Sequence, residues 1–542
     1  MDMCGTVLQI QGSRITAQPL LSEATGSLLV WNGEYLNHEI SDLSDTNLVL
    51  ALLESTDDVA ATLARIEGPF AFVYFDNPSS TLWFGKDKVG RRSLLASLSA
   101  DRTKLIISST ALEGGSEIPA GFGIYKLSLN SPSLDLVTWP HPSSIHLDSF
   151  LAGTLNADLD HLHSAFRSGI RRHMESISVP GPFGILFSGG LDSVIMTCIA
   201  SDLFPMFSKK FTSIDLINVA CADCDSPDRS TGLVSFEDLL TKYPSVPFRF
   251  VCVDISPADL EAHQEHIVTL ASPNTTLMDF NISSALWFGS RADGHLLDPS
   301  FLKNPEWTFI RSQILSAESL ENAAENRRTK KDTETYNHRG PCVLCCKRKA
   351  KPGCIKSACK MCCKDTACLG HNGLGSASVN TSVCVADFLR KHSLGVYQST
   401  CRILLVGHGA DELFGGYGRH ATRNERLGAE GLRQEMLLDL GRLWQRNLGR
   451  DDRVMADHGR DVRHPFLDEC VVEYVGQLSV HALGSNKQLL RDLCRELLGV
   501  IGASMFRKRA IQFGTRLAQK TNQTVFGSHS KGSGTDVYRL VS

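Results

Sequence analysis

A short glycine- and serine-rich run after an apolar stretch has the composition of a phosphate-binding loop. Residues 185–193 read Ile-Leu-Phe-Ser-Gly-Gly-Leu-Asp-Ser and lead into an apolar run at 194–200. Two adjacent glycines let the backbone approach an anion, and the amides at the start of a following helix point toward it. Ser188 and Ser193 add hydroxyl donors, whereas Asp192 would repel a bare phosphate, so we expect a divalent cation between them. The alternative is a strand-to-helix turn that binds nothing.

A second segment carries acidic residues just after another apolar run. Residues 404–417 read Leu-Leu-Val-Gly-His-Gly-Ala-Asp-Glu-Leu-Phe-Gly-Gly-Tyr, so Asp411 and Glu412 follow a predicted strand at 402–406. In a parallel sheet, this strand would bring Asp411 to the same edge as Asp192. Carboxylates that converge on a triphosphate need a bridging Mg²⁺. A helix dipole alone also favours acidic residues at a helix start, so this segment is less specific by itself.

Basic residues late in the chain could neutralise charge at such a site. Lys508 lies in the run Phe-Arg-Lys-Arg-Ala-Ile-Gln-Phe-Gly at 506–514, and Lys487 and Arg491 are spaced to share one helical face. A cation beside an α-phosphate stabilises the charge that develops during nucleotidyl transfer. Each of these residues could instead be a solvated surface cation.

Three segments together resemble, in order, signatures of the asparagine synthetase family: 188–193, 407–417 and 461–468. The first is similar to the pyrophosphate loop of ATP pyrophosphatases, and the Walker A pattern is absent. The resemblance covers about 1–298 and 379–520. It implies that ATP activates aspartate as β-aspartyl-AMP and that ammonia then gives asparagine, AMP and pyrophosphate.

The same resemblance implies a set of ligand contacts. The residues that would contact ATP are Leu186, Ser188, Gly189, Gly190, Leu191, Asp192, Ser193, Val219, Val406 and Gly407. Asp192 and Asp411 would hold Mg²⁺, and Lys508 would lie at the transferring phosphoryl centre. Family members carry Glu where this chain has His408. His408 could also accept a proton from the attacking nitrogen, since its unperturbed pKa is about 6.5, but it has no fixed negative charge.

The amino-terminal part contains a possible oxyanion hole. Asn32 and Gly33 follow an apolar strand, and an Asn side chain with a backbone N–H can stabilise an oxyanion, although Asn-Gly also forms plain hairpin turns. With Cys4, 68–72 and 86–92, these residues resemble a class II glutamine amidotransferase of the Ntn type.

This second resemblance implies that Cys4 attacks glutamine with its own α-amine as base, that Asn32 and Gly33 form the oxyanion hole, and that Glu34 and Asp45 bind the substrate. Met1, Asp2 and Met3 precede Cys4, and only 27 residues separate Cys4 from Asn32, fewer than in the family. Because the mechanism needs a free α-amine on the cysteine, we expect weak or absent glutaminase activity from the chain as written.

A lysine-rich segment holds closely spaced metal-ligand residues: Cys342, Cys345, Cys346, Cys354, Cys359, Cys362, Cys363, Cys368 and His371. Two Cys-x2-Cys pairs and a Cys-x2-His suffice for tetrahedral Zn²⁺ sites, and metal would supply folding energy to a segment that is poor in apolar residues. Free thiols or some disulfides are the alternative. The lysines suit a nucleic acid or an acidic protein, but they would also keep a small module soluble.

The remaining sequence predicts a two-domain α/β chain. The 542 residues are 42% apolar with a net charge of −4, which favours neither nucleic acid nor membrane binding overall. No membrane span or secretory signal is recognisable, and a cytoplasmic setting is expected. We predict a β-rich α+β layered domain at 1–140 and a doubly wound parallel-sheet ATP pyrophosphatase domain at 155–520. A Cys-rich insertion at 299–378 would interrupt the second domain, and 521–542 would form a flexible tail.

Individual elements follow from hydrophobic periodicity. Predicted helices are 45–54, 57–66, 158–175, 192–202, 257–271 and 280–290. Predicted strands are 28–31, 68–75, 82–84, 104–108, 183–187, 214–220, 248–253 and 402–406.

Three functions are consistent with these features. The first is a synthetase that amidates aspartate with nitrogen from glutamine or free ammonia. The second is a binding or scaffold protein that keeps the synthetase fold and a zinc module but not full turnover, which His408 and the short amino-terminal part favour. The third, an RNA-modifying enzyme, rests on the pyrophosphate loop and the basic cysteine segment.

Overall fold

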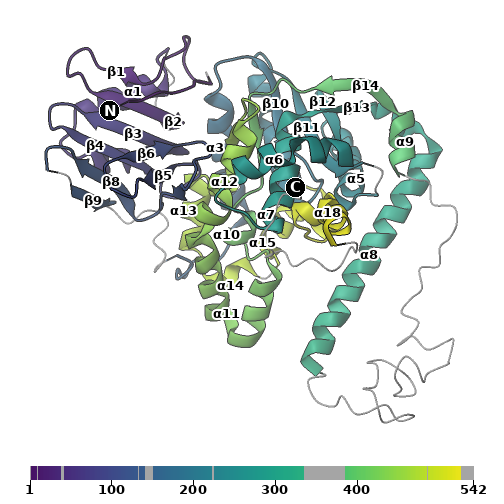
Figure 1. Ribbon diagram of the computed structural model, residues 1–542. Helices are drawn as coiled ribbons and strands as arrows, with labels where there is room; N and C mark the ends of the chain where they lie inside the picture. Colours follow the sequence, from purple (N-terminus) through teal and green to yellow (C-terminus); the bar gives the residue numbers. More distant parts are fainter. Residues whose placement is uncertain are drawn as a thin grey trace. The chain divides into compact units, whose positions relative to one another are not determined.

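The computed structural model describes residues 2–8, 10–37, 42–131, 133–140, 150–222, 225–334, 385–484 and 486–526 (Figure 1). The chain divides into two compact units: Met1–Ser300 together with His392–Ser542, and Phe301–Lys391. The larger unit contains an amino-terminal antiparallel domain and an α/β domain.

Two antiparallel sheets build the amino-terminal domain. The larger has the order β1-β2-β3-β4-β8-β9, with bounds Leu20–Leu21, Leu28–Gly33, Phe70–Asp76, Thr81–Lys86, Gly123–Ser128 and Ser133–Thr138. The smaller has the order β6-β5-β7, with bounds Leu105–Ser108, Leu95–Leu98 and Ser116–Glu117. Two helices accompany them, α1 (Asp45–Glu54) and α2 (Val59–Leu63).

The alternation of side chains along β3 separates these elements into layers. Phe70 and Phe72 pack in one core cluster with Leu53 of α1, whereas Ala71 belongs to a second cluster that contains Leu94, beside β5. Successive side chains of a strand point to opposite faces, so the helices cover one face of the large sheet and the small sheet covers the other. The predicted β-rich layered domain is confirmed.

The α/β domain contains a seven-stranded sheet in the order β14-β13-β12-β11-β10-β15-β16. Its strands are β10 (Gly181–Leu186), β11 (Phe211–Cys221), β12 (Phe248–Ile255), β13 (Asp293–Leu297), β14 (Ser393–Gln398), β15 (Ile403–Leu405) and β16 (Asp461–Arg463). Strands β10, β11, β12, β15 and β16 are parallel, and β13 and β14 pair antiparallel at one edge.

The prediction of a wholly parallel sheet is therefore wrong at this edge. Two helices, α6 (Pro257–Ala271) and α7 (Leu277–Arg291), connect β12 to β13. A single crossover helix returns the chain to the same end of the sheet, but a second helix brings it to the opposite end, so β13 runs against β12.

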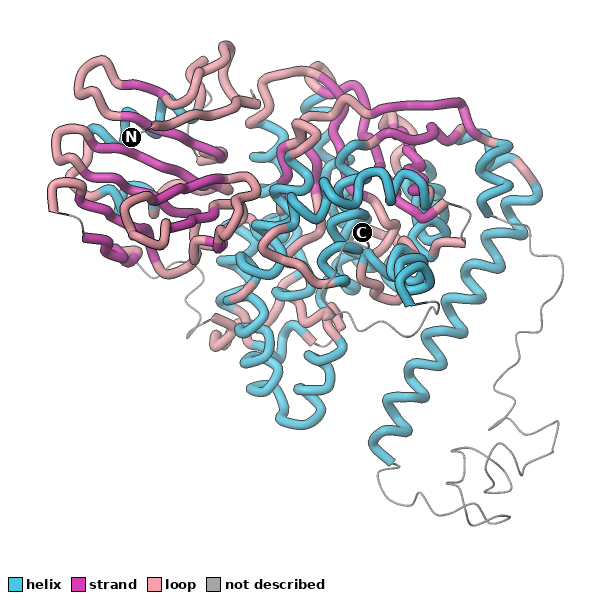
Figure 2. The backbone as a smooth tube through the Cα atoms, in the orientation of Figure 1, coloured by secondary structure: helices cyan, strands magenta, loops and turns pink. Residues whose placement is uncertain are grey.

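Helices cover both faces of this sheet, as Figure 2 shows. Phe250 of β12 contacts Phe236 of α5 (Pro227–Lys242), with ring centroids 5.0 Å apart. Val219 of β11 instead lies in a core cluster with Trp287 of α7 and Met455 of α12 (Gly449–Ala456). The doubly wound arrangement is thus present in the parallel part of the sheet.

The strand order reverses between β10 and β15. From β10 the chain proceeds through β11 and β12 on one side, and β15 and β16 lie on the other. Ligands of open α/β sheets bind outside the carboxyl ends of the strands at such a reversal. The predicted phosphate loop follows β10, and the segment with Asp411 follows β15, so both lie at this point.

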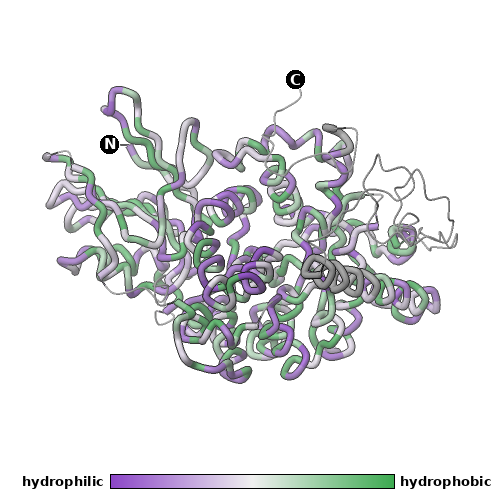
Figure 3. The backbone as a smooth tube through the Cα atoms, turned by 90° about the horizontal axis from the view of Figure 1, so that it is seen from below, coloured by the Kyte–Doolittle hydropathy of each residue, from purple (hydrophilic) through white to green (hydrophobic). Residues whose placement is uncertain are grey.

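The remaining helices of the larger unit are α3 (Leu159–Glu175), α4 (Leu191–Leu203), α10 (Ala410–Leu413), α11 (Gly418–Gly441), α13 (Glu469–Gln477), α14 (Val480–Leu483), α15 (Gln488–Asp492), α16 (Ile501–Met505), α17 (Ile511–Gly514) and α18 (Leu517–Phe526). The smaller unit contains α8 (Pro305–Glu334) and α9 (Val385–Lys391), joined by stacking of Trp307 on Phe388. Hydrophilic and hydrophobic residues interchange along the coloured helices of Figure 3, and no helix in the described ranges is long and apolar enough to cross a membrane.

Buried ion pairs join the amino-terminal domain to the α/β domain within the larger unit. Arg92 pairs with Asp452 at 3.1 Å and with Asp461, and Arg463 pairs with Glu34 at 3.0 Å. All five side chains are less than a tenth exposed. Buried charges depend strongly on their partners, so this network fixes the amino-terminal domain beside β16.

The turn after β10 packs closely against α5 at Gly189. Gly189 has a φ of +73°, and a Cβ there would lie 2.4 Å from the backbone of Gly232 in α5. We expect Gly189→Ala to lower the free energy of unfolding by about 2 kcal/mol or more, because both the left-handed backbone and the overlap are costly. Urea denaturation measures this change.

Gly181→Ala is the matched control, since no atom lies within 4 Å of a Cβ at Gly181. It should change stability by less than about 0.5 kcal/mol. Equal effects of the two substitutions would contradict the close approach of the loop to α5.

Candidate functional site

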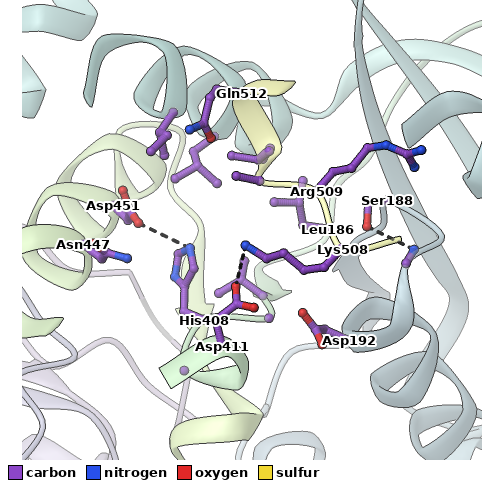
Figure 4. Close-up of a pocket in the computed structure, with 18 of the residues that line it drawn as sticks. Leu186, Ser188, Asp192, His408, Asp411, Asn447, Asp451, Lys508, Arg509 and Gln512 are labelled. Atoms are coloured by element: carbon purple, nitrogen blue, oxygen red, sulfur yellow. Dashed lines mark hydrogen bonds and ion pairs between the residues drawn. The ribbon is translucent and has the colours of Figure 1, made fainter. Parts of the chain in front are cut away.

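A pocket of about 810 Å³ opens at the carboxyl ends of β10 and β15 (Figure 4). Its lining includes nearly all predicted ATP and magnesium residues: Leu186, Ser188, Gly190, Leu191, Asp192, Ser193, Val219, Val406, Gly407 and Asp411. His408 and Lys508 line the same space. Gly189 does not line it, but its left-handed conformation shapes the loop.

The phosphate-loop candidate is held from behind by hydroxyl groups of α5. Thr231 donates a hydrogen bond to the Ser188 carbonyl at 2.8 Å, and Ser235 donates to the Gly189 carbonyl at 2.7 Å. Gly190 is the N-cap of α4 and supplies no side chain to cap the helix. The amides at the start of α4 are therefore available to an anion in the pocket.

One buried lysine connects the two acidic segments. Lys487 Nζ lies 2.6 Å from Asp192 Oδ2 and 2.8 Å from Asp411 Oδ1, and its side chain is 2% exposed. Lys508 Nζ lies 3.1 Å from the other oxygen of Asp411. Two carboxylates and two ammonium groups thus meet at the point where the strand order reverses.

The charges shift the titration of these groups. Burial raises the pKa of Asp192, although Lys487 opposes this shift. Burial acts in the same direction on Asp411, but Lys487 and Lys508 outweigh it and lower the pKa of that carboxyl to about 2. Asp411 is therefore ionised throughout the physiological range.

Asp192 offers an oxygen that could ligate a cation. Its Oδ1 atom is buried and has no hydrogen-bond partner. Among the described residues there is no group of three or more His, Cys, Asp or Glu side chains that could enclose a metal ion. Mg²⁺ is commonly held by one or two carboxylates with phosphate oxygens and waters as the other ligands, so the residues fit a nucleotide-bound Mg²⁺ rather than a protein cage.

The opposite part of the pocket is apolar. Leu186 of β10 and Val219 of β11 lie against Gly289 of α7, where a Cβ would approach them to 2.9 and 3.1 Å. Ile282 and Leu286 of α7 also line the pocket. Flat apolar surface beside a polar phosphate site suits a nucleotide base and its ribose.

A histidine and a carboxylate face each other beside Lys508. His408 Nε2 lies 3.3 Å from Asp451 Oδ2, and His408 Nδ1 is buried without a hydrogen-bond partner. Burial lowers the pKa of His408, against the attraction of Asp451. Figure 4 shows the His408 ring and the Lys508 side chain on either side of the space above Asp411.

Several of these residues were missed or misplaced by sequence reasoning. Lys487 and Arg491 both line the pocket, but Lys487 is the left-handed N-cap of α15, with a φ of +58°, rather than a residue within that helix. Asp451 and Tyr417 line the pocket as well. Lys487 was predicted only as a cation on a helical face, and no role was predicted for Asp451, so their contacts in the fold are what identify them.

The predicted glutamine-site residues lie in the amino-terminal domain, where Glu34 and Asp45 have protein partners. Cys4 is exposed, and no hydrogen bond within the described part of the chain joins it to Asn32 or Gly33, the last two residues of β2. Glu34 is 4% exposed, accepts a hydrogen bond from Gln11 and pairs with Arg463 of the α/β domain.

Burial raises the pKa of Glu34 to about 8, with Arg463 acting against it. Asp45 begins α1 and accepts a hydrogen bond from the Trp31 indole at 2.9 Å. Both proposed glutamine ligands are thus engaged by protein groups.

The predicted zinc ligands from Cys342 to His371 lie outside the described residues.

The carboxyl of Glu412 makes stability depend on pH. Burial, and then the charge of Asp411, raise its pKa to about 7, and Tyr417 donates a hydrogen bond to it at 2.6 Å. Because the pKa of Glu412 is higher in the folded than in the unfolded chain, protonated Glu412 contributes to the free energy of unfolding. This contribution is complete below the unfolded pKa, near 4.5, and is lost as the pH rises through 7. Glutamine does not titrate, so we expect the free energy of unfolding of Glu412→Gln to rise relative to that of the unmodified protein by roughly 2 kcal/mol as the pH is raised from 5 to 8.

Urea denaturation at several pH values measures this difference, and Glu425→Gln, at an exposed position of α11, is the control. A difference between Glu412→Gln and the unmodified protein that stayed constant from pH 5 to 8 would show that Glu412 is not titrating in this range.

Comparison with known proteins agrees with this arrangement. A model of the glutamine amidotransferase domain matches residues 6–112, and a model of asparagine synthase matches residues 421–524. The mouse protein named asparagine synthetase domain-containing protein 1 is 24% identical, over 96% of this chain and 90% of its own length. A yeast protein, from Saccharomyces cerevisiae, also named for an asparagine synthetase domain, is 26% identical over 91% of this chain and 79% of its own length.

Another relative has a higher sequence identity over a shorter segment. A putative glutamine-hydrolysing asparagine synthetase of Methanocaldococcus jannaschii is 49% identical over 72 residues, which cover 13% of each chain. With an amino-terminal amidotransferase-type domain and a carboxyl-terminal α/β domain of mixed sheet, the chain is similar to proteins of the asparagine synthase family along most of its length.

Proposed function

We propose that the chain is an ATP-dependent ligase that joins the side-chain carboxylate of aspartate to AMP and then transfers the aspartyl group to ammonia. The observation that carries this proposal is the meeting of Asp192, Asp411, Lys487 and Lys508 beside the amino end of α4. Anion-binding amides, carboxylates for a cation and two lysines are what transfer of a nucleotidyl group requires.

Each part of the pocket has a role in this proposal. Ser188, Ser193 and the amides of 189–193 would bind the β- and γ-phosphates, and Leu186 and Val219 would contact the adenosine. Mg²⁺ bound by Asp192 and Asp411 would neutralise charge on the leaving pyrophosphate. Lys508 would stabilise the α-phosphate as the aspartate oxygen attacks it.

The amide-forming step needs a base, because ammonia gains a positive charge as it attacks the acyl carbon. His408 is suited to this step, since burial lowers its pKa and leaves it neutral near pH 7. It stands where family members carry Glu.

Pyrophosphate release tests the proposal. The full chain with ATP and Mg²⁺ should release pyrophosphate faster with aspartate than without it. Asp192→Asn and Lys508→Met should each lower the rate about a hundredfold or more, because each removes charge at the reacting phosphates. Lys209→Met, at an exposed position outside the pocket, is the control and should leave the rate unchanged.

Three outcomes would overturn the proposal. Nucleotide binding without pyrophosphate release would favour the scaffold function, and release stimulated by tRNA rather than aspartate would favour RNA modification. Unchanged nucleotide affinity of Asp192→Asn in magnesium buffer would show that Asp192 does not belong to a phosphate site.

We propose free ammonia as the nitrogen donor. The support is that Glu34 contacts Arg463 and Gln11, that Asp45 accepts a hydrogen bond from Trp31, and that both residues are less than a tenth exposed. Ammonium chloride should therefore sustain amide formation at least about tenfold faster than an equal concentration of glutamine. Release of ammonia from glutamine alone by the chain that begins at Met1 would contradict this.

We also propose that residues 342–371 bind Zn²⁺, on the spacing of their cysteines. Metal analysis of the purified chain before and after chelation tests this.

A further inference from the structure

A buried carboxylate, Asp451, lies behind His408. Asp451 lies in α12 and is 1% exposed. Its Oδ1 atom accepts a hydrogen bond from Arg450 at 2.7 Å, and Arg450 also pairs with Asp279 of α7. One oxygen of Asp451 is thus fixed by a buried guanidinium, and the other, Oδ2, faces His408 Nε2 at 3.3 Å.

The His408 ring is also fixed on one of its faces. His464 stacks against it with ring centroids 5.3 Å apart and planes inclined by 25°. Both nitrogens of His464 are buried without a hydrogen-bond partner, and burial lowers its pKa well below 6.5. A neutral His464 holds the ring in place without competing with Asp451 for its proton.

We infer that Asp451 is a positioning residue that keeps the proton of His408 on Nε2, so that the bare Nδ1 serves as the base in the amide-forming step. This inference rests on the proposed function. A carboxylate that accepts the N–H of one ring nitrogen sets the tautomer and leaves the other nitrogen free to accept a proton.

The proposed amide-forming step uses His408 as the proton acceptor. Attack of ammonia on the acyl carbon forms a C–N bond, and the C–O bond to AMP breaks with its electron pair going to AMP. The surplus proton of the nitrogen moves to His408 Nδ1. The resulting imidazolium then faces Asp451, whose carboxylate supplies the negative charge that His408, in place of Glu, does not.

The two half-reactions separate this role from a structural one. ATP–pyrophosphate exchange that depends on aspartate reports activation alone, whereas asparagine formation also needs the base. Asp451→Asn should lower the rate of asparagine formation about tenfold to a hundredfold and leave exchange within about twofold. His408→Gln should give at least as large a loss, again without loss of exchange.

A double-substituted chain tests whether Asp451 acts through His408. If it does, His408→Gln with Asp451→Asn should form asparagine no more slowly than His408→Gln alone. A further loss in the double variant, or an equal loss of exchange and amide formation in Asp451→Asn, would overturn the inference. So would an Asp451→Asn variant with unchanged amide formation.

Asp457→Asn is the matched control. Asp457 follows α12 and lies 2.8 Å from His266 Nε2, so it forms a second His–Asp pair, but neither residue lines the pocket. Loss of asparagine formation in this control equal to that in Asp451→Asn would show that removing any such pair disturbs the fold.

A spectroscopic measurement tests the tautomer without any turnover. Nitrogen-15 NMR of the full chain labelled at histidine, with His408→Gln to assign the signal, should show His408 protonated on Nε2 alone at pH 7.5. Asp451→Asn should change that pattern. A His408 ring protonated on Nδ1, or unaffected by Asp451→Asn, would overturn the inference, whereas absence of aspartate-dependent exchange in the unmodified chain would overturn only the proposed function.

Discussion

The ammonium group of Lys487 joins the two acidic segments at the reversal of strand order in the α/β sheet. It contacts Asp192, which follows β10, and Asp411, which follows β15. Removing one partner of a buried ion pair commonly costs about 3–5 kcal/mol, because the remaining charges stay buried. The left-handed backbone of Lys487 is secured by a hydrogen bond from its own amide to the Phe414 carbonyl at 3.1 Å. The spacing of the two acidic segments, and with it the phosphate end of the pocket, depends on this contact.

A second set of buried charges decides what the amino-terminal domain can do. Glu34, which family resemblance assigns to glutamine, faces Arg463 of β16, and Arg463 also pairs with Asp461. Asp461 in turn pairs with Arg92 of the amino-terminal domain. Glu34 therefore belongs to a buried set of polar contacts that links the amino-terminal domain to β16.

Much of the fold could be predicted from local pattern. Strands β10, β11, β12 and β15 are largely apolar, and the predicted strands match them within three residues, whereas α5 was not predicted. Strands β13 and β14 were missed because they lie at the edge of the sheet, where most of their side chains are not buried and the hydrophobic pattern is weak.

The site could be predicted only as far as it lies in contiguous motifs. The Ser188 loop and the Asp411 segment are short runs with a recognisable composition, and the structure brings both to one pocket. Lys487 was missed as a buried bridge because its partners are remote in sequence, and an isolated lysine is usually solvated. Asp451 was also missed, because its partner is remote in sequence. Its neighbour Asp452 contacts a different residue: Asp451 faces His408, and Asp452 faces Arg92.

In the proposed reaction, the aspartate side-chain carboxylate attacks the α-phosphorus of ATP in this pocket. Aspartate labelled with oxygen-18 in that carboxylate follows the bond directly, because the attacking oxygen stays on phosphorus when ammonia displaces AMP. Mass spectrometry after turnover with ammonia should find one oxygen-18 atom in each AMP. AMP without label, or label in orthophosphate alongside ADP, would contradict the account.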